Sequence, residues 1–265
     1  MSRFLLKTLA VIILCSAFFV AYLVIAADSN SQSVEFDPAN SEQCSKADDN
    51  TTSITGDMTI EAWVKMYADP ASGAVYGIVG KNNCGAVRCS YSFDYFNNSG
   101  VLNLQIRLSA LGATTVDRFV AKKLISNKWY YLAVVYDSAA GSATFYAKEE
   151  GGELEKVGDT QTGLPTSIND NVSDFQIGGT DDAAKFSGLV DEVRLWSKQR
   201  TRQELEESSD KELLFPIGGL QGYFRLNGNG NDDAQGNAVS CSAGARFTDA
   251  KPDRSQGFGS FVDTF

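Results

Sequence analysis

After residue 30 the chain is a succession of short segments in which apolar and polar residues alternate, separated by turns rich in Gly, Asn, Asp and Ser. Successive side chains of a β-strand point to opposite faces, so this alternation is typical of strands with one buried face. A new segment begins roughly every 8–15 residues, which favours an antiparallel β-sandwich over alternating strands and helices. The predicted strands are 33–37, 58–66, 74–81, 90–96, 101–108, 115–121, 129–137, 142–149, 174–179 and 185–196, with shorter ones at 222–227, 237–241 and 245–247.

Two of these strands indicate which side chains should form the core. In 58–66, the apolar residues Ile60, Ala62 and Val64 fall on one face. The strand 129–137 is apolar on both faces, which is typical of a central strand buried on both sides. We also predict that all three tryptophans are core residues: Trp63, Trp129 and Trp196.

The sequence contains one strong helix signal, which follows the main set of strands. Thr201 and Glu204 have the spacing of a capping box, in which each side chain satisfies a backbone N–H group of the other residue. Leu205 should then face the domain, and the helix should end near Ser208.

Composition excludes several classes of function. The chain has no histidine, so it lacks the commonest general base, the usual catalytic zinc ligand and any Ser-His or Cys-His dyad. Its formal net charge is -10. An acidic surface repels phosphate backbones, and we therefore expect no nucleic-acid partner.

The N-terminus predicts export. Arg3 and Lys7 precede an uncharged apolar run over 8–27, which ends in the small residues Ala26 and Ala27. This is the pattern of a signal peptide, and the run is also long enough for a membrane span. Residues 1–27 are therefore predicted to be a cleaved signal peptide or an N-terminal anchor. The rest would be secreted or held at the outer face of a membrane, with membrane contact only through this segment.

Cysteine usage agrees with export. Apart from Cys15, which lies in the apolar run, the chain has Cys44, Cys84, Cys89 and Cys241. An even number of cysteines in an exported protein indicates disulfides, and four cysteines allow three pairings. We favour Cys84–Cys89, which closes a short loop, together with Cys44–Cys241, which ties the first part of the domain to the last. The alternative is a four-thiolate zinc site, but the spacing lacks paired C-x-x-C motifs.

Several of these segments, in this order, resemble the laminin-G-like jelly-roll family within the concanavalin A-like lectin/glucanase fold. The most specific of them is FSGLVDEVRLWSKQRTRQEL at 186–205. The others are VEFD at 34–37, MTIEAWVK at 58–65, IVGK at 78–81, WYYLAVVYD at 129–137, TFYA at 144–147 and FQIGG at 175–179.

The resemblance implies an all-β, two-sheet antiparallel jelly-roll sandwich with one short helix after the main strands. The domain would cover 31–248, with a core at 33–208 and extra strands at 220–247. Residues 249–265 are polar and are predicted to be a tail.

Glycosidases of this fold need two carboxylates on one strand that point into the same cleft. The nearest acidic pair is Asp191 and Glu192, but adjacent residues of a strand face opposite sides, and the position two before Asp191 is Leu189. We therefore predict that the protein is not an enzyme. Glycoside hydrolysis is the weakest alternative.

Asp191 is the best candidate for a metal ligand. Its strand face is otherwise apolar, with Leu189, Val193 and Leu195, and a buried carboxylate requires compensation. Members of this fold often bind a structural calcium ion through carboxylate and carbonyl oxygens. We therefore expect calcium at Asp191, with Asp37 as a weaker co-ligand. The alternative is a structural acid held by hydrogen bonds.

Exposed aromatic rings can stack on sugars, and four residues form the predicted ligand face: Tyr76, Tyr91, Tyr95 and Asn97. Each could instead serve packing alone. The resemblance and these residues together predict an extracellular, non-catalytic binding module. It would be lectin-like, recognising glycans or glycoproteins, and stabilised by calcium. The alternative is a surface adhesion or structural protein that contacts other extracellular proteins.

Overall fold

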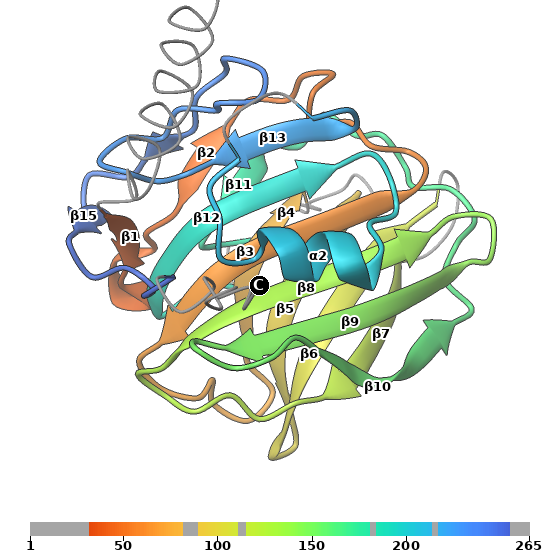
Figure 1. Cartoon of the computed structure of the whole chain (residues 1–265), viewed down its shortest axis with the longest axis horizontal. Helices are drawn as coiled ribbons and strands as arrows, with labels where there is room; N and C mark the ends of the chain where they lie inside the picture. Colours follow the sequence, from red (N-terminus) through yellow and green to blue (C-terminus); the bar gives the residue numbers. More distant parts are fainter. Residues whose placement is uncertain (1–31, 82–89, 111–114, 181–183, 214–216, 255–265) are drawn as a thin grey trace, which may run out of the picture.

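The structure is a computed structural model and describes residues 32–81, 90–110, 115–180, 184–213 and 217–254. Over these residues the chain forms two antiparallel sheets stacked face to face (Figure 1). The predicted all-β sandwich with one short α-helix is confirmed.

The first sheet has eight strands in the described residues, in the order β10-β9-β8-β3-β12-β1-β15, with β13 paired to β12. They are β1 (Ser33–Phe36), β3 (Met58–Met66), β8 (Trp129–Asp137), β9 (Ser142–Glu149), β10 (Glu155–Thr162), β12 (Gly188–Trp196), β13 (Leu220–Phe224) and β15 (Arg246–Thr248).

The second sheet has seven strands in the same residues, in the order β14-β2-β11-β4-β5-β6-β7. They are β2 (Cys44–Lys46), β4 (Val75–Lys81), β5 (Tyr91–Asn98), β6 (Val101–Ser109), β7 (Thr115–Ala121), β11 (Phe175–Ile177) and β14 (Ser240–Cys241). A short 3-10 helix, η1 (Pro38–Asn40), and the helix α2 (Arg202–Ser208) complete the described elements.

The main core lies between the two sheets. Ile60, Ala62 and Val64 of β3 pack there, as their alternation predicts. The central strand β8 is buried on both faces: Leu132 packs in the main core, whereas Tyr131 packs in a second cluster on the outer side of the first sheet. The three tryptophans are buried, but they belong to clusters outside the main core.

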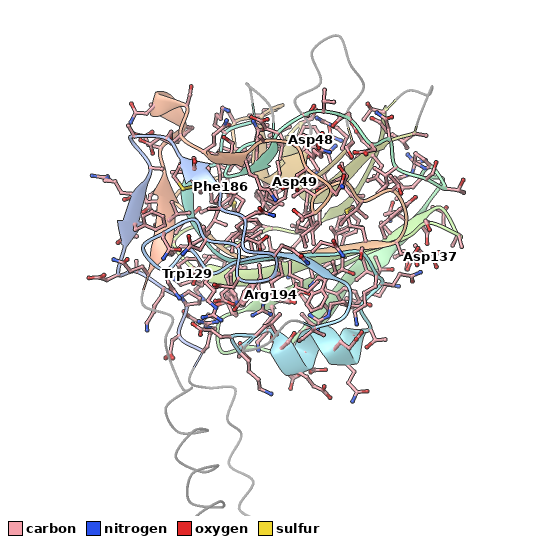
Figure 2. The ribbon with its side chains drawn as sticks, turned by 90° about the horizontal axis from the view of Figure 1, so that it is seen from above. Asp48, Asp49, Trp129, Asp137, Phe186 and Arg194 are labelled. Carbon is pink, nitrogen blue, oxygen red and sulfur yellow. A yellow bond between two sulfur atoms is a disulfide. The ribbon has the colours of Figure 1, made fainter. Side chains whose placement is uncertain are left out.

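Helix α2 covers the outer face of the first sheet (Figure 1; Figure 2 shows the helix along one side of the molecule). Its capping box is confirmed, because the Glu204 backbone N–H donates to Thr201 Oγ1 (3.2 Å) and the Thr201 N–H donates to Glu204 Oε2 (2.7 Å). Leu205 is buried against the sheet with Trp63 and Trp129.

Strand β12 contains a β-bulge at Glu192, whose φ is 51°. Its pairing with β3 shifts register between Asp191 and Arg194. Val190 and Val193, three residues apart, both pack in the main core, although strict alternation would put them on opposite faces. The strand 185–196 was predicted to carry Leu189, Asp191, Val193 and Leu195 on one face. This prediction is therefore wrong.

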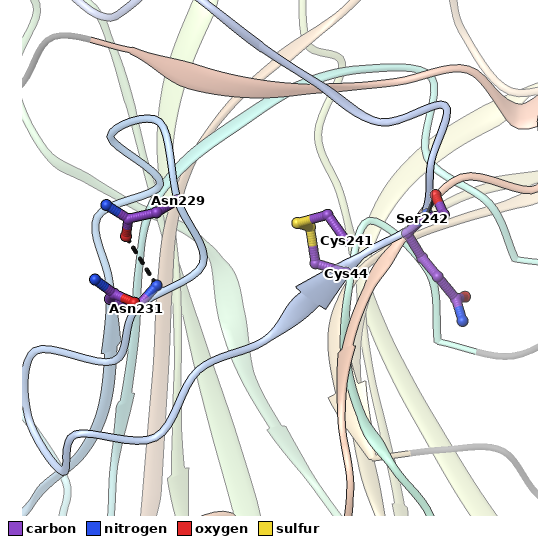
Figure 3. The surroundings of a disulfide bond; sticks show 6 residues. Cys44, Asn229, Asn231, Cys241 and Ser242 are labelled. Carbon is purple, nitrogen blue, oxygen red and sulfur yellow. Dashed lines mark hydrogen bonds between the residues drawn. A yellow bond between two sulfur atoms is a disulfide. The ribbon is translucent and has the colours of Figure 1, made fainter.

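The predicted Cys44–Cys241 disulfide is confirmed, and it joins the neighbouring strands β2 and β14 (Figure 3). Cys84 and Cys89 lie outside the described residues, so their predicted pairing stays a prediction. The predicted leader, residues 1–27, also lies outside them. In the part of the chain that the structure describes, no helix is long and apolar enough to cross a membrane.

The first residues of the predicted polar tail lie against the domain. Residues 249–254 were expected to belong to a polar tail, but they pack on the domain: Pro252 is buried, and Gln32 Nε2 donates to Asp249 Oδ1 (3.1 Å). Side-chain and backbone contacts, which the polar composition of this segment does not reveal, hold it in place.

Asp232 gives the fold a pH-dependent element. Burial raises the pKa of its carboxyl, although the N–H groups of Tyr223 and Ala234, both 2.9 Å from Oδ1, oppose the shift. A raised folded-state pKa adds stability below the ordinary pKa of aspartate, and this stability is lost as pH rises through the folded value. Asp232→Asn should therefore gain stability relative to the wild type as pH rises above the ordinary pKa of aspartate. Urea unfolding at several pH values checks this, with Asp159→Asn, at an exposed position of β10, as a control. Parallel curves for Asp232→Asn and the wild type would contradict it.

Candidate functional site

The predicted aromatic ligand face is not exposed. Tyr91 and Tyr95 of β5 are fully buried in the main core. The Tyr91 hydroxyl donates to the backbone oxygen of Thr52 (2.8 Å), and that of Tyr95 to the backbone oxygen of Lys122 (3.0 Å). Burial raises the pKa of Tyr95 to about 12, which keeps the hydroxyl protonated. The prediction that these rings present an exposed surface is wrong, because buried carbonyl groups satisfy their hydroxyls.

The other two predicted ligand residues also have structural partners. The ring of Tyr76 is half-buried and meets Phe186 edge-on, with centroids 5.9 Å apart. Asn97 Nδ2 donates to the Pro70 carbonyl (2.7 Å), and its Oδ1 accepts from the Gly100 N–H (2.8 Å). Asn97 therefore fixes the β5–β6 turn, and the four predicted residues do not form one exposed face.

The residues between the buried tyrosines point the other way. Since Tyr91, Phe93 and Tyr95 face the core, alternation directs Ser92 and Asp94 to the outer face of the second sheet. Ser92 Oγ donates to Asp94 Oδ2 (2.6 Å), and Thr180 Oγ1 donates to Asp94 Oδ1 (2.8 Å) from the chain that follows β11.

Strand register extends this polar surface across β6 and β7. Asp94 lies opposite Gln105, and Gln105 lies opposite Phe119. A parallel row places Ser92 opposite Arg107, which is opposite Asp117. We call these outward side chains the candidate face: Ser92, Asp94, Gln105, Arg107, Asp117 and Phe119.

The candidate face has an aromatic edge. Phe119 is 40% exposed and meets Phe96 of β5 edge-on, with ring centroids 6.3 Å apart. The row that starts at Phe119 passes through Gln105 to the fully buried Asp94, so it runs from the surface into the molecule. An exposed ring beside polar groups can stack on the apolar face of a ligand while those groups bind its polar atoms.

Two buried hydrogen-bond acceptors on the outer face of the second sheet lack a donor among the described residues. Gln105 Oε1 is buried and has no hydrogen-bond partner among the described residues, and the same holds for Gln176 Oε1 on β11. An unsatisfied buried acceptor costs about 1–3 kcal/mol, which a donor from a ligand would recover. On the outer edge, Arg107 Nε donates to Asp117 Oδ1 (3.0 Å).

The fold and the order of its segments identify the family. A model of the concanavalin A-like lectin/glucanases superfamily, of the laminin G type, matches residues 37–206. The chain belongs to this superfamily. The resemblance seen in the sequence is thereby confirmed.

Solved structures with low sequence identity share the fold. A candidate carbohydrate-binding protein from Bacteroides ovatus matches with a TM-score of 0.62 and 19% identity, over 82% of this chain. The match spans 59% of that protein's chain, which is therefore considerably longer. The heptameric SAP-like pentraxin of Limulus polyphemus matches with a TM-score of 0.58 and 12% identity, over 84% of this chain and 96% of the other. No curated protein matched the sequence.

Asp37 and Asp191, the two residues predicted to bind calcium, do not form one site. Phe36 pairs with Gly188, so Asp37 lies about four positions, roughly 13 Å, from Asp191 along β12. Asp191 Oδ1 accepts the Glu192 N–H (2.9 Å), and Asp37 Oδ1 accepts the Ala39 N–H (2.9 Å). The described residues contain no cluster of three acidic, cysteine or histidine side chains able to hold a metal ion. Calcium therefore enters no step of the function proposed below.

The acidic segment of β12 also does not form the pair of carboxylates that glycosidases of this fold need. The Glu192 carboxylate is buried and bound by Arg194 Nη2 (2.7 Å) and the Tyr223 hydroxyl (2.7 Å). A carboxylate fixed by these donors is not free to protonate a leaving group or attack a sugar.

The residues of the candidate face were missed, although the sequence carried a signal for two of the six. In 90–96, strict alternation of aromatic and polar residues already directs Ser92 and Asp94 away from the tyrosines. Gln105 and Phe119 join them only through strand register, which the sequence does not specify.

Proposed function

We propose that the protein is a non-catalytic glycan-binding module that holds sugar on the candidate face. The observation that carries this proposal is the row from the exposed Phe119 through Gln105 to Asp94. It pairs an aromatic platform with the amide oxygen of Gln105, which has no hydrogen-bond partner among the described residues. This oxygen accepts hydrogen bonds, so it suits the hydroxyl groups of a sugar.

Two further observations support the proposal. The outer face of the first sheet is covered by α2, whereas the second sheet presents a partly exposed ring. The Bacteroides ovatus protein with the same fold is described as a carbohydrate-binding candidate.

We infer that the module acts outside the cytoplasm, secreted or anchored by its N-terminal segment. The disulfide between Cys44 and Cys241 supports this, because structural disulfides persist in oxidising compartments.

Binding should depend on Phe119, the exposed member of the row, and on the buried Gln105 beside it. Phe119→Ala removes the stacking surface and Gln105→Ala the amide acceptor, so each should weaken glycan binding about tenfold or more. A glycan array first identifies the bound sugar, and titration calorimetry then gives the affinity of each variant.

Val101→Ala is the matched control, because Val101 is an apolar residue of β6 that is also exposed. It should bind as the wild type does. Unchanged affinity in both row variants would overturn the assignment of the face. Binding of proteins without any glycan would favour the adhesion alternative, and release of reducing sugar would show an enzyme.

A further inference from the structure

The sequence contains two Asn-Gly pairs, which follow one another in the segment between β13 and β14: Asn227-Gly228 and Asn229-Gly230. In such a pair the backbone nitrogen of the glycine can attack the side-chain amide of the asparagine, because glycine has no Cβ to hinder the approach and has a freely variable backbone. The two pairs have the same covalent structure. A difference in their reactivity can therefore come only from the fold around them.

The first pair is held at both of its reacting groups. Gly228 N, the nitrogen that would attack, donates to the Leu226 carbonyl (3.1 Å). Asn227 Oδ1 accepts from the Gln32 N–H (3.2 Å), and Asn227 Nδ2 donates to Glu212 Oε1 (3.5 Å). Attack within this pair requires these hydrogen bonds to break first, which slows the reaction.

The second pair is open where the first is held. Asn229 is exposed, and neither its Nδ2 group nor the Gly230 N–H has a hydrogen-bond partner among the described residues. Asn229 Oδ1 accepts from the Asn231 N–H (3.0 Å; Figure 3). This donor polarises the amide carbonyl and stabilises the negative charge that develops on Oδ1 during attack. The fold thus activates the electrophile and leaves the nucleophile and the leaving group free.

The fold also requires glycine after Asn229. A Cβ at position 230 would lie 2.1 Å from the Val239 carbonyl oxygen, which is far inside contact distance. The Val239 N–H donates to the Gly230 carbonyl (2.8 Å), so the two backbones lie side by side just before β14. The reactive pair is therefore part of the packing of this segment, since a larger residue does not fit at position 230.

We propose that Asn229 is a site of spontaneous modification, at which the folded protein converts asparagine into aspartate and isoaspartate. The Gly230 nitrogen forms a bond to Asn229 Cγ, and the bond from Cγ to Nδ2 breaks. Ammonia leaves with the proton that the Gly230 nitrogen has lost, and a succinimide ring remains. No electron transfer occurs, and the only co-reactant is solvent water in the next step.

Water then opens the ring at one of its two carbonyl carbons. Opening at Cγ restores the ordinary main chain and gives aspartate. Opening at the backbone carbonyl carbon gives isoaspartate, in which the main chain passes through Cβ and Cγ. Both products carry one additional carboxylate, so the formal net charge of -10 becomes more negative by one. Because Asn229 is exposed, the new charge stays in water and the fold tolerates it.

Peptide mapping of the incubated protein tests this proposal. The folded, disulfide-bonded protein is kept at about pH 8 and about 37 °C and then digested in mild acid, where the attacking nitrogen stays protonated. Mass spectrometry with fragmentation locates each converted asparagine. Asn229 should convert at least about tenfold faster than Asn227, because only Asn227-Gly228 must break hydrogen bonds. The rate at Asn229 should rise about tenfold for each pH unit, since the nucleophile is the deprotonated amide.

Unfolding provides the matched control, because it removes every contact that distinguishes the two pairs. In guanidinium chloride with reductant, Asn227 and Asn229 should convert at similar rates. Folding should therefore slow Asn227 by at least about tenfold and Asn229 by much less.

Asn229→Gln serves as the control variant. It keeps an exposed amide but requires a larger ring, so conversion at position 229 should fall to background while Asn227 keeps its rate. If folding slowed both asparagines equally, or if Asn229 did not convert in the folded protein, the proposal would be overturned.

Discussion

Replacing Arg194 by methionine should lower the free energy of unfolding by about 3–5 kcal/mol, because the change removes the closest cation from the buried Glu192 and leaves Glu61 with Arg200 alone. Arg194 is fully buried and contacts Glu61 and Glu192, whose side chains are also fully buried. Burial alone would lower the pKa of Arg194, but Tyr223, Glu192 and Glu61 together raise it, so the guanidinium stays charged. Methionine fills much of the volume and supplies neither the charge nor the donors.

Urea unfolding of the purified domain measures this loss. The control is Arg107→Met, which removes a guanidinium from a solvent-exposed pair with Asp117 on the candidate face. Exposed pairs contribute about 0–1 kcal/mol, so this variant should remain close to the wild type. If Arg194→Met lost no more than Arg107→Met, the buried contacts of Arg194 with Glu61 and Glu192 would not be stabilising.

Removing the Cys44–Cys241 disulfide in a Cys44→Ala/Cys241→Ala variant should cost about 5 kcal/mol. The bond spans a sequence separation of 197 residues, and the entropy that a cross-link removes from the unfolded chain grows with the logarithm of loop length. A domain of this kind has about 5–15 kcal/mol of total stability, so the variant should be marginal at 37 °C.

Urea unfolding with and without reductant separates this disulfide from the remaining cysteines. Reductant should destabilise the wild type by about as much as the double substitution does. Any effect of reductant on the double variant would report on Cys84 and Cys89. A double variant as stable as the wild type would show that the link adds nothing to the close pairing of β2 with β14.

The alternation of apolar and polar residues predicted most of the strands, because every second side chain of a half-buried strand faces the core. The strands β3, β7, β8 and β9 have the predicted bounds. Strand β10 was missed because its residues, EKVGDTQT, are mostly exposed and polar at the edge of the first sheet. Strand β2 was missed because it has only three residues.

The candidate site was harder to predict than the fold. The tyrosines of β5 were interpreted as exposed because a ring with a hydroxyl suits a sugar, but the backbone oxygens of Thr52 and Lys122 satisfy those hydroxyls in the interior. The bulge at Glu192 adds one residue to a strand, and no periodic pattern reveals it. The row from Phe119 to Asp94 crosses three strands, so it exists only once the register is set.

The pairing of the first and last segments also sets the order of folding. Val34 of β1 lies opposite Val190 of β12 and Phe247 of β15, so the first strand cannot pair until these much later residues have been synthesised. Contacts this distant in sequence fold slowly, and a chain emerging from a ribosome or a membrane channel would expose unpaired strand edges meanwhile. We therefore expect the nascent domain to depend on chaperones until almost its whole length has emerged.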